Sequence, residues 1–324
     1  MKPTQKQCYS GIGGQAVLEG VMMKNCEKYA VAIRKLDGTL TVERGDYPGL
    51  LHGSYLLRIP FVRGVFVFLD SLILGMRCVN LSAEYYAEEE SETKADAAQE
   101  EGEKQEADKK EGSTDTWMSV LVVGLSLVLA IGLFMILPYF LAQWIGRFTQ
   151  NRLLKAALEG ILRLAIFLTY MVGISLMKDI RRLYQYHGAE HKCINCLESG
   201  KALTLENARE STRFHKRCGT SFILLVVLVS IVVFFFIRAE DPLTRVVLRV
   251  LLLPVISGIS YELIRLAGRS SHPLVQAISL PGLWTQRITT REPDDEMLEV
   301  AMASVEAVFD WKTYLAKTFP ESAA

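Results

Sequence analysis

Apolar residues are concentrated in long runs that predict membrane-spanning helices. Residues 117–145 carry no charged side chain, and residues 220–237 form a second uncharged run of 18 residues. Residues 157–177 and 246–267 are also mostly apolar, with their charges near the ends. About 20 apolar residues cross a hydrocarbon core of about 30 Å. The pattern therefore predicts an α-helical membrane protein with about four spanning helices in a membrane domain over residues 117–268.

Residues 55–82 are apolar as well, but charged residues interrupt them. A charge at the bilayer centre costs about 2.5–3.5 kcal/mol on insertion scales, which disfavours a fifth span. An amphipathic helix at the interface, or a re-entrant helix, fits this pattern better, and a span is the alternative. The interrupting residues are Arg58, Arg63, Asp70 and Arg77.

The N-terminal region, residues 1–54, predicts a small β-rich unit. Tyr29–Arg34 and Thr39–Glu43 alternate apolar and polar positions on either side of Asp37-Gly38. Because glycine accepts the positive φ that a tight turn requires, this pattern indicates a β-hairpin. The glycines of residues 11–20 do not form a G-x-G-x-x-G fingerprint, so we interpret them as sites of close backbone packing.

Residues 83–116 have a different composition from the rest of the chain. Residues 84–115 contain 13 acidic residues and 4 lysines among Ala, Gln, Gly and Ser. Such a segment buries too little apolar surface to offset its ordering entropy. The composition predicts an acidic, disordered linker.

Lysine and arginine positions predict the orientation of the spans in the cell membrane. Nine of these residues lie in the connection 178–219, whereas the connections on the other side hold far fewer. Basic residues favour the cytoplasmic side, so this loop and both termini are expected there. The polar first residues also argue against a cleaved signal peptide. With 36 basic and 36 acidic residues, the chain lacks the positive excess of a nucleic-acid binder, so the expected partner is the lipid bilayer.

The C-terminal segment, residues 269–324, contains a predicted amphipathic helix that begins near Pro293. A proline in the first turn and acidic residues after it are typical of helix N-termini. Apolar residues then recur on one face, so the helix is expected to dock on the protein or on the membrane surface. These apolar residues are Leu298, Ala301, Met302, Val305, Val308 and Phe309.

The loop 178–219 carries the residues with the clearest catalytic chemistry. His187 and His191 are four positions apart, so on a helix both imidazoles lie on one face, as a shared metal requires. With Glu190 they spell H-x-x-E-H, in which two histidines bind zinc and the glutamate acts as base. A third protein ligand is then expected from His215 or Cys218.

A different metal site uses some of the same residues. Cys193-x2-Cys196 and His215-x2-Cys218 could supply four ligands to a closed, structural zinc site. Such a site would have no open position for substrate. In the absence of metal, the histidines would be polar residues at the wet end of a helix.

Two glutamates lie near the ends of predicted spans. Glu159 has Arg163 one turn later, and Glu262 has Arg265 three positions later. Intramembrane ionisable residues are functional candidates by default, but this spacing favours ion pairs at helix ends.

Five strings of the sequence together resemble the YqhQ family of bacterial multi-pass membrane proteins of unknown function. They are GGQAVLEGVMM (13–23), HGAEHK (187–192), RFHKRCGTSF (213–222), LLPVISGISYELIR (252–265) and TTREPDD (289–295). The resemblance covers about residues 10–310, except for the acidic segment. It implies that the protein is a metal-dependent enzyme. The site residues that the resemblance implies are His187, Glu190 and His191 in the second string. The third string adds His215 and Cys218. Lys216 stands where the family pattern has proline, and Cys193 and Cys196 belong to no family string, which favours the open site.

The sequence thus predicts a zinc-dependent, membrane-embedded hydrolase at the cytoplasmic face, of unknown substrate. His187, His191, His215 and Cys218 are the candidate metal ligands, and Glu190 is the candidate catalytic base. The alternative is a non-catalytic membrane scaffold or assembly factor with a structural metal or none.

Overall fold

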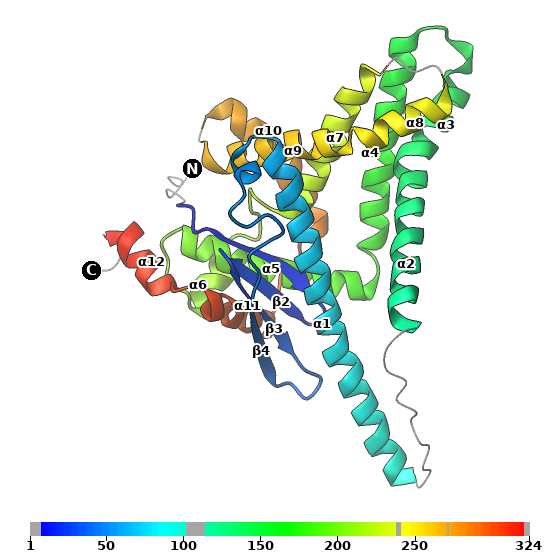
Figure 1. Cartoon of the computed structure of the whole chain (residues 1–324). Helices are drawn as coiled ribbons and strands as arrows, with labels where there is room; N and C mark the ends of the chain where they lie inside the picture. The colour runs from blue at the N-terminus through cyan, green and yellow to red at the C-terminus, as the bar shows by residue number, and fades with distance from the viewer. Residues whose placement is uncertain (1–7, 102–113, 238–240, 271, 321–324) are drawn as a thin grey trace. The chain divides into compact units, whose positions relative to one another are not determined.

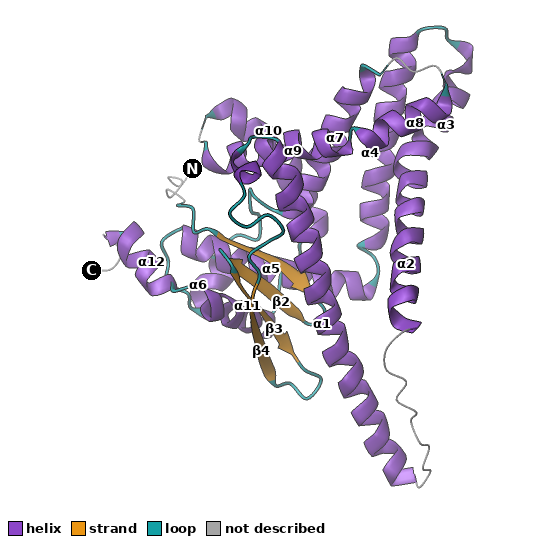
Figure 2. Ribbon diagram, in the orientation of Figure 1, coloured by secondary structure: helices purple, strands orange, loops and turns teal. Residues whose placement is uncertain are grey.

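The computed structural model describes residues 8–101, 114–237, 241–270 and 272–320. The described chain is mostly helical, with one β-sheet near its N-terminus (Figures 1 and 2). It forms two compact units. Unit 1 comprises Met1–Ser91, Ile174–Leu225 and Ser257–Ala324, and unit 2 comprises Glu92–Gly173 and Val226–Ile256.

Unit 1 is built on a four-stranded antiparallel sheet in the order β1-β2-β3-β4. The predicted hairpin at Asp37-Gly38 is confirmed, because Gly38 adopts a φ of 85° between β3 and β4. The preceding turn joins β1 to β2 with Glu19 at a φ of 47°. The strands are β1 (Ile12–Val17), β2 (Gly20–Asn25), β3 (Lys28–Arg34) and β4 (Leu40–Asp46).

Both faces of the sheet are buried, because alternate residues of β2 and β3 point to opposite sides. Val21, Met23 and Ala32 face a core shared with α5 (Lys178–Glu198) and α11 (Asp295–Val308). Met22, Val31 and Ile33 face Leu74 and Cys78 of α1 (Val62–Glu101). The sheet is therefore the middle layer between α1 on one face and α5 with α11 on the other.

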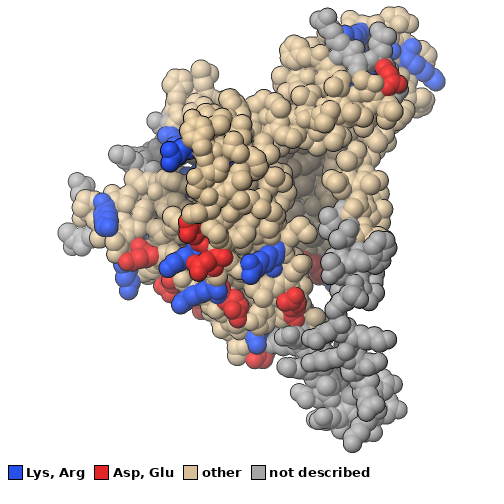
Figure 3. Space-filling model, viewed as in Figure 1, with Lys and Arg blue, Asp and Glu red and all other residues tan. Residues whose placement is uncertain are grey.

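The predicted C-terminal helix is confirmed as α11, whose N-cap Asp294 accepts a hydrogen bond from the N–H of Met297. Its apolar face packs on the sheet and on α5. Figure 3 shows charged side chains gathered over the part of unit 1 that holds the strands and α11. This unit also contains α6 (Leu205–Glu210), α10 (Pro273–Thr289) and α12 (Trp311–Thr318), with a 3₁₀ turn at Tyr55–Arg58.

Two sequence predictions concern the residues of helix α1. The helix continues through Glu101, although a disordered linker was predicted from residue 83; Glu, Ala, Lys and Gln are strong helix formers, so a helix can persist without apolar residues. Residues 102–113 of the predicted linker lie outside the described residues. The part Val62–Ala87 is long and apolar enough to cross a membrane. Its charges have partners, since Arg63 pairs with Glu262 and Asp70 accepts hydrogen bonds from Tyr47 and Leu50.

Three or four described helices, including α1, are long and apolar enough to span a membrane. Within the predicted span 117–145, a π-helical turn at Gly132–Ile136 separates α2 (Thr114–Ile131) from α3 (Leu137–Ile145). The predicted span 157–177 corresponds to α4 (Arg152–Ile174), and 220–237 corresponds to the shorter α7 (Gly219–Phe235). A 3₁₀ turn, Gly146–Phe148, follows α3.

The fourth predicted span, 246–267, is two helices rather than one. Helices α8 (Pro242–Leu251) and α9 (Leu253–Arg269) meet at an angle of 41°. Pro254 explains the break, because proline has no N–H for a helical hydrogen bond and its ring clashes with the preceding turn. The pair counts as one bent span or as a re-entrant element.

Candidate metal centre

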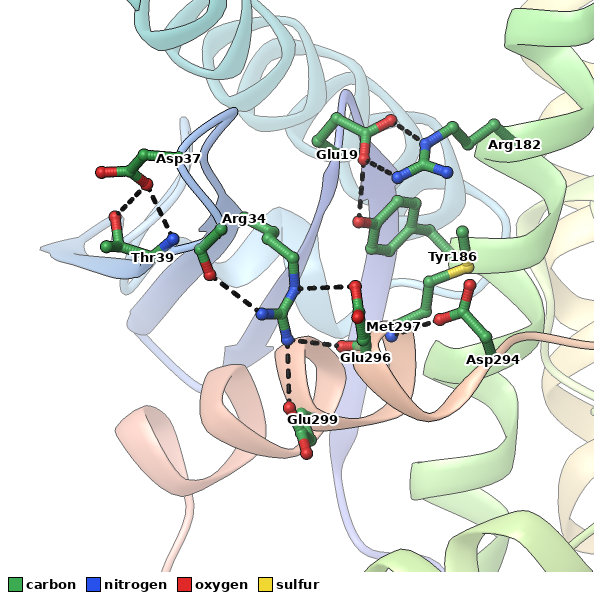
Figure 4. A network of polar contacts seen from close by, with 11 residues as sticks. Glu19, Arg34, Asp37, Thr39, Arg182, Tyr186, Asp294, Glu296, Met297 and Glu299 are labelled. Carbon is green, nitrogen blue, oxygen red and sulfur yellow. Dashed lines mark hydrogen bonds and ion pairs between the residues drawn. The ribbon is translucent and has the colours of Figure 1, made fainter.

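Helix α5 presents His187, Glu190 and His191 on one face, because these residues are three and four positions apart. The start of this helix is tied to the turn between β1 and β2. Arg182 and Tyr186 both donate hydrogen bonds to the carboxylate of Glu19 (Figure 4). These hydrogen bonds hold α5 in place at Tyr186, one residue before His187.

Three candidate ligands converge. One nitrogen of His187, one nitrogen of His191 and the Sγ of Cys218 lie within 4.8 Å of one another. The Nε2 of His187 is 3.2 Å from the Sγ of Cys218, and the two imidazole centroids are 4.3 Å apart. Among the described residues, this is the one group of three or more His, Cys, Asp or Glu side chains with such spacing.

Backbone carbonyls orient both imidazoles. The Nδ1 of His187 lies 2.9 Å from the carbonyl oxygen of Thr289, and the Nδ1 of His191 lies 2.7 Å from that of Arg213. A carbonyl only accepts, so each Nδ1 donates its proton. In the neutral form that metal binding requires, the Nε2 of each ring then carries the lone pair, as in metal sites where a second interaction fixes the ring.

Helix α5 also holds the segment that carries Cys218 back to the histidines. The Nζ of Lys192 donates to the carbonyls of Arg209 and Ser211 at 2.7 and 3.0 Å. The Nδ2 of Asn195 donates to the carbonyls of Thr212 and Phe214 at 2.7 and 3.1 Å. This series of carbonyl contacts along one face of α5 positions the chain that leads to Cys218.

Two glycines allow close approach to the centre. A Cβ on Gly188 would lie 2.0 Å from the carbonyl oxygen of Arg291, so any side chain there would displace the segment after α10. A Cβ on Gly14 would lie 2.8 Å from the Cγ of Glu190. The prediction of close packing in the N-terminal glycine cluster is confirmed at Gly14.

Glu190 is buried close to the two histidines, which act on its carboxylate through their charge. Burial raises the pKa of Glu190, while His187 and His191 oppose this shift. The residue therefore combines proximity to the ligands with the basicity of a proton acceptor.

Charge coupling links Cys218 and His187. Burial alone would raise the pKa of Cys218, but the two histidines hold it well below its ordinary value. Burial opposes protonation of His187, whereas Cys218 and Glu190 raise the pKa of this imidazole to about 9. The arrangement favours a thiolate, which is the form of cysteine that binds metals.

His215 lies near the cluster but has different partners. Its ring centroid is 5.5 Å from that of His191, while its Nε2 is 3.5 Å from a carboxylate oxygen of Glu198. Gln286 fixes its backbone, accepting from the N–H of His215 and donating to its carbonyl. Burial lowers the pKa of His215. The structure thus gathers three of the four predicted ligands and pairs the fourth with Glu198.

The cysteines of the closed-site alternative lie elsewhere. Cys193 is fully buried in the apolar core between α5 and the sheet. Cys196 lies 3.8 and 3.3 Å from the carbonyl oxygens of Lys201 and Ala202. Neither belongs to the group formed by His187, His191 and Cys218.

The comparisons with known proteins agree on one family. The sequence profile described as "Protein of unknown function (DUF1385)" matches residues 59–311. The chain belongs to the DUF1385 family. This DUF1385 chain is also 36% identical over 297 residues to "Uncharacterized protein YqhQ" of Bacillus subtilis (strain 168), with 90% of each chain covered, so the predicted resemblance is confirmed. No solved structure matches the chain.

Sequence reasoning missed the residues that position the ligands. Thr289 and Arg213 act through backbone carbonyls, which no side-chain pattern reveals. Glu198 lies seven positions after His191, on the same face of α5, and this periodicity could have indicated it.

Proposed function

We propose that this DUF1385 protein is a membrane-associated, zinc-dependent hydrolase whose metal is held by His187, His191 and Cys218. The observation that carries the proposal is the convergence of two imidazoles and one thiol within 4.8 Å, with both Nδ1 atoms bonded to carbonyls. Three protein ligands with one open position are typical of catalytic rather than structural zinc sites. A mixed imidazole and thiolate set favours zinc over harder cations.

Glu190 is the proposed general base. A bound zinc ion would supply a water of lowered pKa and polarise a substrate carbonyl or phosphoryl group. Glu190 is one helical position from His191 and three from His187, so its carboxylate can accept a proton from water at the centre. Gly14 leaves the room that this side chain occupies. His215, paired with Glu198, would help to position the wall of the site.

The proposed location is the cytoplasmic face of the cell membrane. Three or four apolar helices support membrane association. The excess of lysine and arginine in residues 178–219 supports a cytoplasmic position for the site and for both termini.

The test uses full-length protein in detergent, loaded with Co²⁺ in place of zinc and titrated with acetohydroxamate. An open metal site predicts one Co²⁺ per chain, a thiolate-to-cobalt absorption band, and a spectral change on adding the hydroxamate. Glu190→Gln should retain the metal but weaken the hydroxamate complex, because the base no longer accepts its proton. Glu206→Gln, at an exposed position of α6, is the matched control. A spectrum that ignores hydroxamate would support a structural metal in a scaffold, and absence of Co²⁺ binding would contradict any metal role.

One contact favours a second candidate, a thiol hydrolase without metal. His187 Nε2 lies 3.2 Å from Cys218 Sγ, the geometry of a nucleophile and its base. Iodoacetamide would then alkylate Cys218 at neutral pH equally fast with or without zinc. The metal proposal predicts that zinc protects this cysteine.

A further inference from the structure

Unit 2 contains a buried cluster of charges outside the candidate metal centre. Glu159 and Arg163 come from α4, and Arg249 comes from α8. Their residues are 8%, 3% and 3% exposed, respectively. The spacing of four residues in the sequence indicates the ion pair between Glu159 and Arg163. Arg249 comes close to this pair only in the folded chain.

Glu159 is shared by both arginines. Its Oε1 lies 2.8 Å from Nη2 of Arg163 and 2.7 Å from Nη2 of Arg249. Arg163 completes its contacts by donating from Nε to the carbonyl of Phe134, at 3.1 Å, and from Nη1 to the hydroxyl of Ser230, at 3.4 Å. Phe134 lies in the π-helical turn Gly132–Ile136, a type of irregularity frequent at functional sites.

Arg249 keeps unused donors. Its Nε and Nη1 are buried and have no hydrogen-bond partner among the described residues. These two atoms carry three of the five N–H groups of a guanidinium. The rings of Phe234 and Tyr139 lie 4.9 and 5.8 Å from its guanidinium carbon, and Arg245, one turn earlier, stacks on the same Tyr139 ring at 4.9 Å.

The cluster therefore has one more positive than negative charge. Two arginines and one glutamate leave this buried cluster with a net charge of +1. An uncompensated charge in such surroundings is costly, so it is expected to attract a counterion. Guanidinium groups match phosphate and other oxyanions better than spherical anions, because their planar N–H groups donate to several oxygens.

We propose that Glu159, Arg163 and Arg249 form an anion-binding site for a phosphate group. Glu159 lies seven residues after the start of α4, which is about 10 Å along a helix axis. In a hydrocarbon core of about 30 Å that begins where α4 begins, that depth is about 5 Å short of the centre, so a lipid phosphate must be drawn about 10 Å inward to reach the arginines. The phosphate can belong to an anionic phospholipid or to a free phosphate ion. When no anion is bound, the Glu159 carboxylate compensates part of the arginine charge.

The test measures binding to full-length protein in detergent micelles. One arm adds phosphatidylglycerol, with diacylglycerol as the phosphate-free lipid, and counts bound lipid by native mass spectrometry. The other arm titrates inorganic phosphate against chloride at equal ionic strength by calorimetry. Binding in the first arm alone identifies a lipid headgroup, and binding in the second identifies free phosphate.

Three variants separate a ligand site from a structural ion cluster. Arg249→Gln should weaken phosphate binding at least tenfold, whereas Arg147→Gln, which removes an exposed arginine, should leave it unchanged. Glu159→Gln should strengthen binding severalfold, because it removes the competing carboxylate. Circular dichroism would check that each variant folds. If Arg249→Gln fails to fold, the proposal is tested by phosphate binding to the wild type and by the increase in affinity expected for Glu159→Gln. Absence of binding by the wild type in both arms, or equal losses in Arg249→Gln and Arg147→Gln, would overturn the proposal.

Discussion

His187 and Cys218 are 31 positions apart in the sequence, yet Nε2 of the first lies 3.2 Å from Sγ of the second. The contact exists because Lys192 and Asn195 hold the intervening carbonyls against α5. It joins a helix that carries two histidines to the residue just before α7.

Removing the thiol should weaken metal binding. Cys218→Ser replaces a soft thiolate with a hydroxyl that stays protonated, so we expect at least a tenfold loss of zinc affinity. Cys26→Ser, at an exposed cysteine, is the control and should match the wild type. Competition with a colorimetric chelator measures both affinities. Equal affinities in the two variants would exclude Cys218 as a ligand.

Gly14→Ala should disturb the proposed base. The added methyl group would lie 2.8 Å from Glu190 Cγ and 2.9 Å from the carbonyl oxygen of Met22. Overpacking of this kind costs about 1–3 kcal/mol, and it should displace the Glu190 carboxylate. Gly13→Ala is a matched control, since its Cβ would meet nothing within 4 Å. The melting temperature and the hydroxamate affinity should both fall for Gly14→Ala. Equal values for Gly14→Ala and Gly13→Ala would show that the close approach of Gly14 to Glu190 is unimportant.

Gly188→Ala should be more damaging than an ordinary glycine substitution in a helix. Its Cβ would lie 2.0 Å from a backbone oxygen of Arg291, which cannot rotate away, so we expect destabilisation of about 3 kcal/mol. It should also weaken zinc binding by moving the Thr289 carbonyl that orients His187. In α4, Gly173→Ala meets open space and should be neutral or stabilising by up to about 1 kcal/mol. If the melting temperatures of Gly188→Ala and Gly173→Ala shift by the same amount, the explanation from the close approach to Arg291 is wrong.

Acid should release the contacts of Glu198. Burial would raise the pKa of this carboxyl, but His215, Arg217 and the N–H of Ser10 hold it at about 2, below the ordinary value of 4.5. A lowered pKa in the folded state stabilises the protein above pH 4.5, and the stabilisation is lost as the pH falls from 4.5 to 2. The difference corresponds to about 3 kcal/mol at neutral pH.

Glu198→Gln tests this pH dependence. The variant should be less stable than the wild type at pH 7, and the two should converge as the pH falls to about 2. Thermal melts of both proteins in detergent across this range provide the measurement. A constant difference at every pH would show that the ionised carboxylate is not responsible.

Local patterns predicted the parts of the fold that depend on neighbouring residues. The hairpin at Asp37-Gly38 requires a glycine at positive φ, and the histidine face of α5 requires only the helical repeat. The start of α11 follows from the acidic residues after Pro293. In each case the physical cause lies within a few residues of the feature.

Contacts between distant segments could not be predicted in this way. Apolar runs showed where spans could lie, but the partners of the charges in α1, such as Glu262 for Arg63, lie far away in the sequence and could not be predicted from it. By its spacing in the sequence, His215 was as good a candidate ligand as Cys218. Only the structure shows that its imidazole lies close to Glu198 instead. The room that Gly14 leaves for Glu190 also depends on packing between a strand and a helix.

X-ray absorption at the zinc edge tests the central claim most directly. Full-length protein, purified in detergent without chelators, should contain one zinc per chain. Its first shell should show one sulfur at about 2.3 Å and the remaining nitrogen or oxygen ligands at about 2.0–2.1 Å. In Cys218→Ser the sulfur should disappear from the shell. Wild-type protein without stoichiometric zinc, or with more than one sulfur around it, would contradict a centre formed by His187, His191 and Cys218.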